Sequence, residues 1–159
     1  MTHTLLIRET IPEDQSAIEK MMTEFVRDQF KYTNELDIMP AAAVAQMKAL
    51  QGRVMADGGL IYVAEVAEIL VGFVLVLFED REDLTVREAY KSYARLTTVY
   101  VKKAHRLSYI ATKLHHDVEA HVRKLSYEKL KLEVTYMNKD AVKFFQTLGY
   151  KVTALTLEK

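Results

Sequence analysis

The segment from Tyr93 to Val152 constrains the fold of this chain more than any other part of it. Its sequence alternates strand and helix patterns in the order strand, helix, strand, helix, strand. Arg95 to Val101 is rich in β-branched residues and predicts a strand. Apolar residues at helical spacing then predict a long amphipathic helix: Ile110, Leu114, Val118, Val122 and Leu125. This alternation is typical of a sheet with helices packed on its faces.

The elements outside this segment complete the expected order. Leu5 to Arg8 predicts a first strand, and two helical patterns follow before Asp57-Gly58-Gly59. Two strands then form a hairpin joined near Ala67-Glu68, and the second is apolar enough to be buried on both faces: Leu60 to Val66 and Ile69 to Phe78. Tyr32 to Met39 is expected to be a loop.

The last elements are predicted to be a strand, a helix stopped by Gly149, and a final strand: Leu130 to Thr135, Ala141 to Leu148, and Val152 to Leu157. The resulting order is β-α-α-β-β-β-α-β-α-β. It indicates an α/β (α+β) mixed sheet, and at 159 residues a single domain over 1–159 is the simplest organisation.

Composition narrows the function classes. The chain has no Cys, which excludes a disulfide framework, a thiolate metal site and a cysteine nucleophile, and is compatible with a reducing, cytoplasmic setting. A formal net charge of zero argues against a nucleic-acid partner, which normally needs a basic excess. The longest apolar stretch, Ile69 to Phe78, is too short to span a bilayer, and Met1 to Thr4 begins no signal peptide, so no membrane role is expected.

Two later segments carry the candidate chemistry. Arg106 to Ala111 opens a helix five residues after the strand that ends at Val101. A helix start presents unpaired backbone N–H groups and partial positive charge, which suit a diphosphate. In the second segment, Asn138 can cap its helix, and Gly149 suits the left-handed residue that follows a helix. Capping and core packing alone also account for the second segment.

The element order and both segments resemble the GCN5-related N-acetyltransferase (GNAT) superfamily. Arg106-Leu107-Ser108-Tyr109-Ile110-Ala111 has the register of that family's pyrophosphate loop, with Tyr109 at a usual Gly position. Asn138, Ala141, Phe144, Gly149 and Tyr150 match its Asn-x-x-Ala-x-x-Phe-Tyr-x-x-x-Gly-Phe pattern, with Phe145 at the usual Tyr. The resemblance implies acetyl-CoA as co-substrate, no metal, and a cleft where two neighbouring strands splay apart.

The resemblance also implies which residues line the cofactor groove. A backbone N–H of the strand, from Val99 or Tyr100, is expected to polarise the acetyl carbonyl. The residues expected to bind the cofactor come from the strand, from the helix start and from the second segment: Val99, Tyr100, Val101, Arg106, Leu107, Ser108, Tyr109, Ile110, Ala111, Asn138 and Phe145. Several members of the family pair as homodimers, so a homodimer is a possible assembly.

Direct transfer to an amine needs a deprotonated amine, an oxyanion donor and often an acid for the leaving sulfur. Phe145 has no proton to give, and the strand from Arg95 to Val101 has no carboxylate. We therefore take Tyr136 as the candidate acid and Glu133 as the candidate base. The other hydroxyls and carboxylates that remain open are Tyr100, Tyr109, Tyr150, Glu79 and Asp80.

The sequence thus predicts an N-acetyltransferase that moves an acetyl group from acetyl-CoA to a primary amine of a small molecule or peptide. The alternative is a catalytically weak or inactive relative, an acyl-CoA sensor or interaction module, motivated by Tyr109 and Phe145. In a further alternative, the helix start is only basic surface and Tyr109 packs against the core. A metal interpretation was weighed for a histidine-rich stretch, but solvated helix pairs are favoured there: His115, His116, Asp117, Glu119 and His121.

Overall fold

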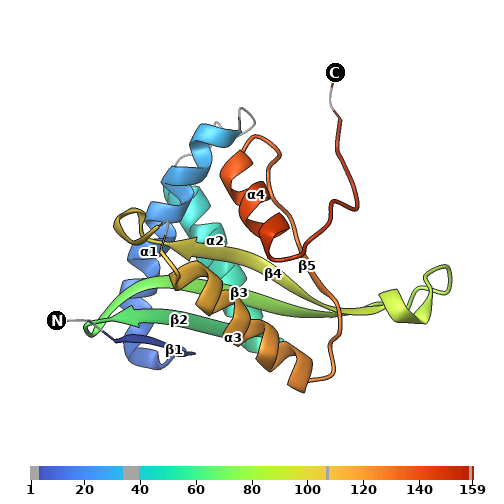
Figure 1. Ribbon diagram of the computed structural model, residues 1–159, viewed down its shortest axis with the longest axis horizontal. Helices are drawn as coiled ribbons and strands as arrows, with labels where there is room; N and C mark the ends of the chain where they lie inside the picture. The colour runs from blue at the N-terminus through green and yellow to red at the C-terminus, as the bar shows by residue number, and fades with distance from the viewer. Residues whose placement is uncertain (1–3, 34–39, 107, 158) are drawn as a thin grey trace.

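A computed structural model describes residues 4–33, 40–106, 108–157 and 159 (Figure 1). Its centre is a five-stranded sheet in the order β1-β2-β3-β4-β5. The strands are β1 (Leu5–Glu9), β2 (Leu60–Val66), β3 (Ile69–Asp80), β4 (Ser92–Val101) and β5 (Leu130–Leu132). The first four are antiparallel neighbours, whereas β4 and β5 run parallel, which confirms the predicted mixed sheet.

Helices cover both faces of the sheet. Two of them, α1 (Gln15–Gln29) and α2 (Pro40–Ala56), lie on one face, and α3 (Ile110–Lys124) lies on the other (Figure 1). The last helix, α4 (Lys139–Thr147), follows β5 and lies at the edge of the sheet that β5 forms. Short 3₁₀ turns occupy Pro12–Asp14, Phe30–Tyr32, Glu88–Tyr90 and Lys103–His105.

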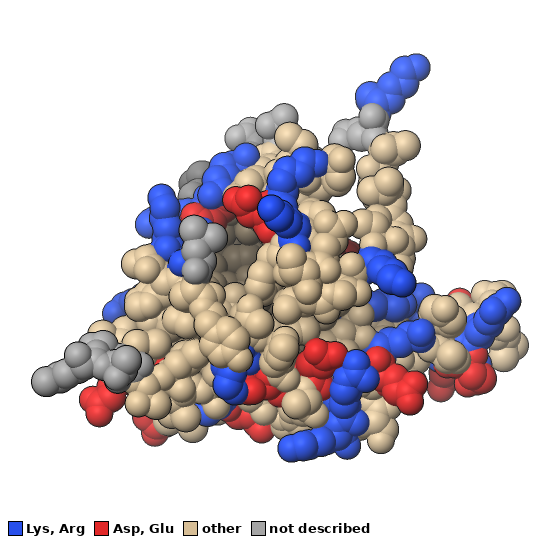
Figure 2. All heavy atoms as spheres, in the orientation of Figure 1, with Lys and Arg blue, Asp and Glu red and all other residues tan. Residues whose placement is uncertain are grey.

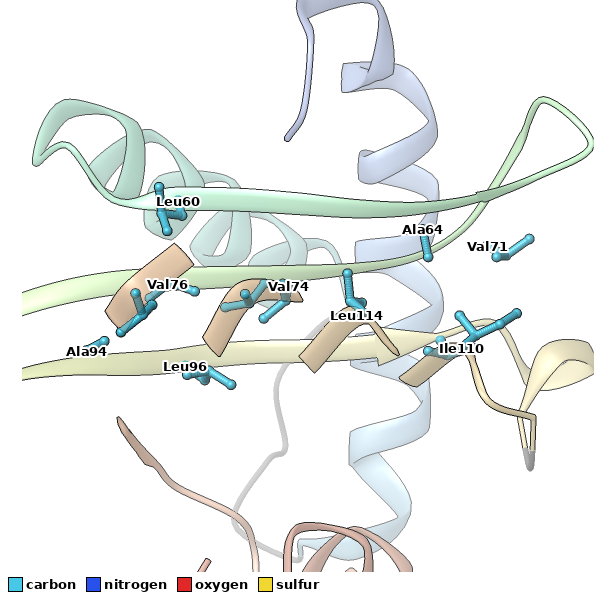
Figure 3. Packing of buried hydrophobic residues seen from close by; sticks show 12 residues of the cluster. Leu60, Ala64, Val71, Val74, Val76, Ala94, Leu96, Ile110 and Leu114 are labelled. Atoms are coloured by element: carbon cyan, nitrogen blue, oxygen red, sulfur yellow. The ribbon is translucent and has the colours of Figure 1, made fainter. Parts of the chain in front are cut away.

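The core has two layers because the central strand is covered on both faces. Residues 70–77 of β3 are all buried, as the dense apolar run predicts. Val74 and Val76 pack toward Leu114 of α3 (Figure 3). Phe73 and Leu75 pack toward the methionines and isoleucine of α1. Burying one such side chain contributes about 1.5–3 kcal/mol, so these two layers fix the positions of α1, α2 and α3.

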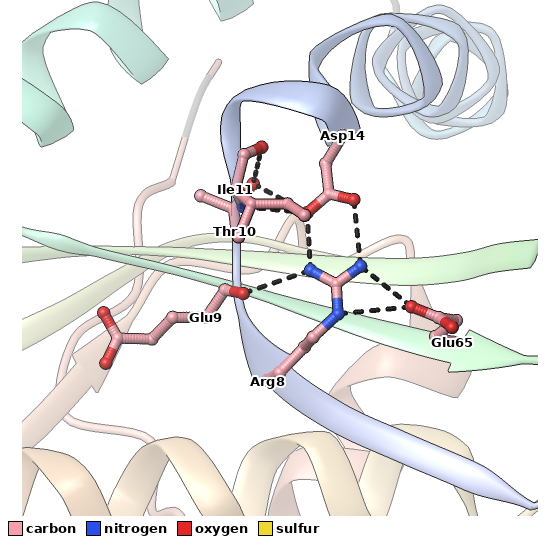
Figure 4. Close-up of polar contacts among 6 residues, drawn as sticks. All are labelled: Arg8, Glu9, Thr10, Ile11, Asp14 and Glu65. Atoms are coloured by element: carbon pink, nitrogen blue, oxygen red, sulfur yellow. Dashed lines mark hydrogen bonds and ion pairs between the residues drawn. The ribbon is translucent and has the colours of Figure 1, made fainter. Parts of the chain in front are cut away.

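Arg8 of β1 fastens the start of α1 to the sheet (Figure 4). Its two terminal nitrogens donate to the carboxylate of Asp14 over 2.6 and 3.0 Å, and one of them also donates to Glu65 of β2 over 2.8 Å. Asp14 is buried and also accepts the N–H of Ile11 over 2.9 Å. The hydrogen bond from Arg8 lowers the pKa of the Asp14 carboxyl against the opposing effect of burial, so the carboxylate stays charged.

The β2–β3 hairpin turns at Ala67 and Glu68, as predicted. Both residues are left-handed, with φ of 50° and 64°, which is the backbone of the two-residue turn that matches strand twist. Gly149, with φ of 92°, confirms the predicted end of the last helix, which begins two residues earlier than expected, at Lys139.

The predicted final strand, Val152 to Leu157, is wrong. Residues 151–157 form no regular element and are exposed. A strand needs a partner for its backbone hydrogen bonds, and β5 is only three residues long, ending at Leu132 rather than Thr135. The expected loop from Tyr32 to Met39 begins inside a 3₁₀ turn, and residues 34–39 of it lie outside the described residues. None of the described helices has both the length and the apolar character needed to cross a bilayer.

Candidate active site

The parallel strands β4 and β5 pair over only three positions and then part. Ala94 to Leu96 lie opposite Leu130 to Leu132, and the pairing ends there. Just beyond, the β3–β4 register shifts so that Thr97 is an extra residue on β4. Such a bulge bends its strand and increases the local twist. The bulge at Thr97 therefore turns the rest of β4 away from β5, and leaves residues 97–101 with one backbone edge unpaired.

The direction of the backbone groups on this edge follows from two hydrogen bonds. The N–H of Lys102 donates to Val71 of β3 over 2.8 Å, so Lys102 faces β3. The carbonyl of Val101 instead accepts Nε–H of Arg106 over 2.8 Å, on the side away from β3. Because these directions alternate along an antiparallel strand, the N–H of Val99 faces the gap and that of Tyr100 faces β3. Of the two predicted amides, Val99 is the one with access to the gap.

A cavity of roughly 180 Å³ lies where the strands part, on the side of α2. Its lining is Leu50, Arg95, Leu96, Thr97 and Glu133. Arg95 is neutralised by Glu79, to which its Nε donates over 2.9 Å, so Glu79 is not a free base. Glu133 is exposed and makes no ion pair within the described part of the chain. The cavity therefore holds one carboxylate that is available to a cation.

The start of α3 lies at the end of the same gap. The helix begins at Ile110, whose N–H is 3.4 Å from the Ser108 hydroxyl, and the N–H groups of its first turn have no acceptor within the helix. Tyr109 is 64% exposed, so the interpretation that its ring packs against the core is wrong. Leu107 lies outside the described residues.

Arg106 is tied to α1 rather than left as a free cation. Its guanidinium pairs with Asp28 of α1 and lies 5.3 Å from the centre of the Tyr100 ring. The Tyr100 hydroxyl in turn donates to Glu24 of α1 over 2.8 Å, and burial, followed by Glu24, raises the pKa of this phenol. These contacts hold the turn before α3 against α1. Arg106 thus links the turn before α3 to α1.

The segment around α4 forms the other side of the groove. The Asn138 side chain accepts the N–H of Ala141 over 3.2 Å, which confirms it as the helix cap. Phe145 is buried, with its ring edge-on to that of Tyr150. Tyr136 is 65% exposed, the ammonium of Lys139 lies over its ring, and it does not line the cavity beside Glu133. In the space-filling view, the surface is hollowed beside α4 above β4 (Figure 2).

The histidine-rich stretch of α3 is not a set of solvated pairs. His115 is 3% exposed and contacts Tyr150, which is a correction to the sequence-based expectation. His121 contacts the Tyr62 hydroxyl at 2.8 Å, while Asp117 pairs with Lys113. Helical spacing identifies neighbours on one helix but not the partners that other elements bring. Nowhere in the described ranges do three or more metal-ligating side chains come together.

Sequence reasoning missed several residues of this region. Thr98, next to the bulge, has a buried hydroxyl without a hydrogen-bond partner, and Thr97 donates to the Leu75 carbonyl over 3.3 Å. Two consecutive threonines in an apolar strand are a signal that can be read in the sequence. Glu24 and Asp28 give no such signal, because only the packing of α1 beside β4 brings them to Tyr100 and Arg106.

A mixed sheet that splays at its parallel pair, beside a helix start with free amides, defines the acyl-CoA N-acyltransferase class of fold. The sequence model described as "Acetyltransferase (GNAT) family" matches residues 19–150, and the chain belongs to this family. A comparison with curated proteins finds no match.

Three solved structures share the fold over nearly their whole length. They are aminoglycoside N-acetyltransferase AAC(6')-Iy in complex with CoA (13% identity, TM-score 0.76, 100% of this chain and 95% of that one), a predicted acetyltransferase with acetyl-CoA from Clostridium acetobutylicum (15%, 0.71, 98% and 96%), and a transcriptional regulator from Bacillus halodurans (20%, 0.72, 98% and 99%). At these identities the similarity concerns the fold.

Proposed function

We propose that this protein transfers an acetyl group from acetyl-CoA directly to a primary amine of a small molecule or peptide. The observation that carries the proposal is the gap after Leu96 and Leu132: the Val99 N–H faces this gap, and a cavity that contains the unpaired carboxylate of Glu133 lies beside Leu96 and Thr97. A thioester carbonyl and an amine need such neighbouring donors and acceptors to react. Family membership and the CoA-bound relatives support the choice of co-substrate.

The hydrogen-bond donors at this site fit the diphosphate and the acetyl group of acetyl-CoA. The first turn of α3, from Ile110 with Ala111 following, offers backbone N–H groups and partial positive charge to the diphosphate. The Tyr109 ring is exposed, so it is not packed over the first turn on the core side, where Ile110 is buried. Asn138 and Phe145 border the pantetheine arm in the proposed pose, and the Val99 N–H donates a hydrogen bond to the acetyl oxygen as negative charge develops on it.

The amine is proposed to enter through the cavity beside α2. Glu133 attracts the ammonium and takes its proton, directly or through water, since an amine with a pKa near 10 is mostly charged at neutral pH. The nitrogen then attacks the acetyl carbon and loses its second proton to water, and the carbon–sulfur bond breaks to leave the amide and the thiolate. Tyr136 is the proposed proton donor to the thiolate, as the nearest exposed hydroxyl before α4.

A second candidate function is an acyl-CoA-binding module with little or no transferase activity. It is favoured by Phe145, which has no hydroxyl, and by Tyr109 at the diphosphate turn. The similar fold of a protein described as a transcriptional regulator shows that this architecture is not confined to proteins described as enzymes. The two candidates share cofactor binding and differ in turnover.

Calorimetry with acetyl-CoA and with CoA tests the part that both candidates share. Binding of both is expected, and no detectable heat at millimolar ligand would remove both candidates. Turnover is then followed by thiol release with a disulfide reagent across a panel of primary amines. The chain has no Cys, so every thiol detected comes from CoA. Steady turnover on any amine selects the transferase, and binding without turnover selects the module.

The wider setting of the proposal is a single domain over residues 1–159 working in the cytoplasm, alone or as a homodimer. The absence of Cys is compatible with that compartment.

A further inference from the structure

The end of α4 is attached to α3 through one pair of side chains. Nε2 of His115 lies 2.9 Å from the hydroxyl of Tyr150, which follows α4 directly after Gly149. The two rings are 5.5 Å apart and nearly perpendicular, and Phe145 of α4 packs edge-on against Tyr150 at 5.6 Å. Neither of the two core clusters contains a residue of α4. These three rings therefore join the end of α4 to α3 outside the two core clusters.

His115 is a buried group that can change its charge near neutral pH. It is almost fully buried, and its Nδ1 finds no hydrogen-bond partner among the described residues. The charged or titratable groups beside it are Glu119, whose oxygen lies 3.9 Å from Nδ1, and His116, both on α3, together with Tyr150 from the segment after α4. Burial lowers the pKa of His115, opposed by Glu119 and reinforced by His116.

We propose that His115 and Tyr150 form a pH-sensitive clasp that docks α4 on α3 while the imidazole is neutral and loosens it when the imidazole takes up a proton. The charged ring is poorly hydrated where it lies, and Glu119 is too distant to accept a hydrogen bond from Nδ1. Releasing α4 exposes the ring to water. Burial raises the pKa of the Tyr150 phenol, so the phenol stays protonated throughout and does not titrate with the imidazole.

The sign of the effect follows from proton linkage. A histidine whose pKa is lowered in the docked state binds fewer protons there than in the released state. Docking is therefore complete above the ordinary imidazole pKa of about 6.5 and weakens as the pH falls below it. Because α4 borders the proposed groove, the clasp sets the position of one wall. The inference concerns docking of the helix and stands whether or not the protein transfers acetyl groups.

Hydrogen exchange of the intact protein at pH 7.5 and pH 5.5, with rates normalised for intrinsic exchange, tests the clasp. Protection of the α4 amides is expected to fall several-fold at the lower pH, within a limit of about tenfold per pH unit for one proton. The second half of α3 should not change, since its residues pack in the core. His115→Gln should abolish the difference between the two pH values, whereas His116→Gln, at the exposed neighbour, should retain it. Equal α4 protection at both pH values in the wild type, or a difference that survives His115→Gln, would overturn the proposal.

An NMR titration of the wild-type histidines keeps the test independent of whether His115→Gln folds. The His115 imidazole is expected to titrate below about 6.5, and Tyr150→Phe should move its midpoint upward as α4 loosens and water reaches the ring. A wild-type midpoint at or above 6.5 would contradict the clasp, because protonation would then favour the docked state.

Discussion

Replacing Gly72 by Ala tests whether the close approach of β3 and β4 determines the position of β4, the strand that is proposed to polarise the acetyl carbonyl. Gly72 lies opposite Val101 in the sheet. A Cβ at this position would lie 2.8 Å from the carbonyl oxygen of Tyr100 and 3.2 Å from a methyl group of Val101. The first of these neighbours is backbone, so the contact can be relieved only by moving β4 away from β3.

The expected change in unfolding free energy can be compared with that of a second Gly→Ala substitution, Gly52→Ala. Overpacking of this kind destabilises by about 1–3 kcal/mol. Gly52, in α2, has nothing within 4 Å of an added Cβ. Gly52→Ala should therefore stabilise by about 0.5–1 kcal/mol, because Ala is the better helix former. The two Gly→Ala variants are expected to differ in unfolding free energy by about 1.5–4 kcal/mol, with opposite signs relative to the wild type.

Urea unfolding followed by circular dichroism measures both variants. With a slope of about 2 kcal/mol per molar urea, the two midpoints should be separated by roughly 1–2 M. Gly72→Ala should also weaken CoA binding in calorimetry, because Val99 lies on the displaced strand, whereas Gly52→Ala should leave binding unchanged. If Gly72→Ala unfolds at the wild-type midpoint, the sheet accommodates the methyl group freely, and the argument that strand spacing fixes the site is refuted.

Three further predictions concern the proposed cofactor groove and the ion pair between Arg8 and Asp14. Phe145→Tyr should raise turnover with unchanged CoA affinity if protonation of the thiolate limits the rate, and an unchanged rate in the thiol-release assay would mean that another acid or water already serves. Tyr109→Gly should tighten CoA binding in calorimetry, because it clears the approach to the helix start, while weaker binding would show that the ring stacks on the ligand. Asp14→Asn should destabilise by about 1–3 kcal/mol at pH 7, because it removes the charged partner of Arg8. Since the pKa of Asp14 is lowered, the wild-type contribution is complete above about pH 4 and is lost at lower pH, so the urea midpoints of the two proteins should converge on acidification.

Sequence patterns were sufficient to predict those helices and strands whose type depends on local residues rather than on the elements packed against them. The apolar periodicity of 110–125 and the uninterrupted apolar run of β3 correctly predicted a one-sided helix and a strand covered on both faces. The end of α4 at Gly149 was equally readable, because a left-handed residue after a helix favours Gly. The strand predicted at Val152 to Leu157 failed because β5, the edge strand of the described sheet that precedes it in the chain, offers only three residues for pairing.

The candidate site divides in the same way. The helix start at Ile110 and the cap at Asn138 were found in the sequence because both depend on local backbone rules. The choice of Val99 over Tyr100 required the pairing of β4 with β3, since only the hydrogen-bond direction separates two adjacent amides. The pairing of Arg106 with Asp28 could not be predicted for a related reason, because Asp28 lies far away in the sequence and reaches Arg106 only after α1 has packed.

The sequence by itself therefore determined the family, the order of elements as far as α4, the helix start at Ile110 and the cap at Asn138, because these depend on local periodicity, capping and the types of residue present. The tertiary structure alone decided which backbone amide faces the gap, which carboxylate stays unpaired, and that His115 is buried against Tyr150 rather than solvated. Those properties depend on hydrogen-bond direction, charge pairing and burial between elements that are distant in the chain, and no local pattern carries that information.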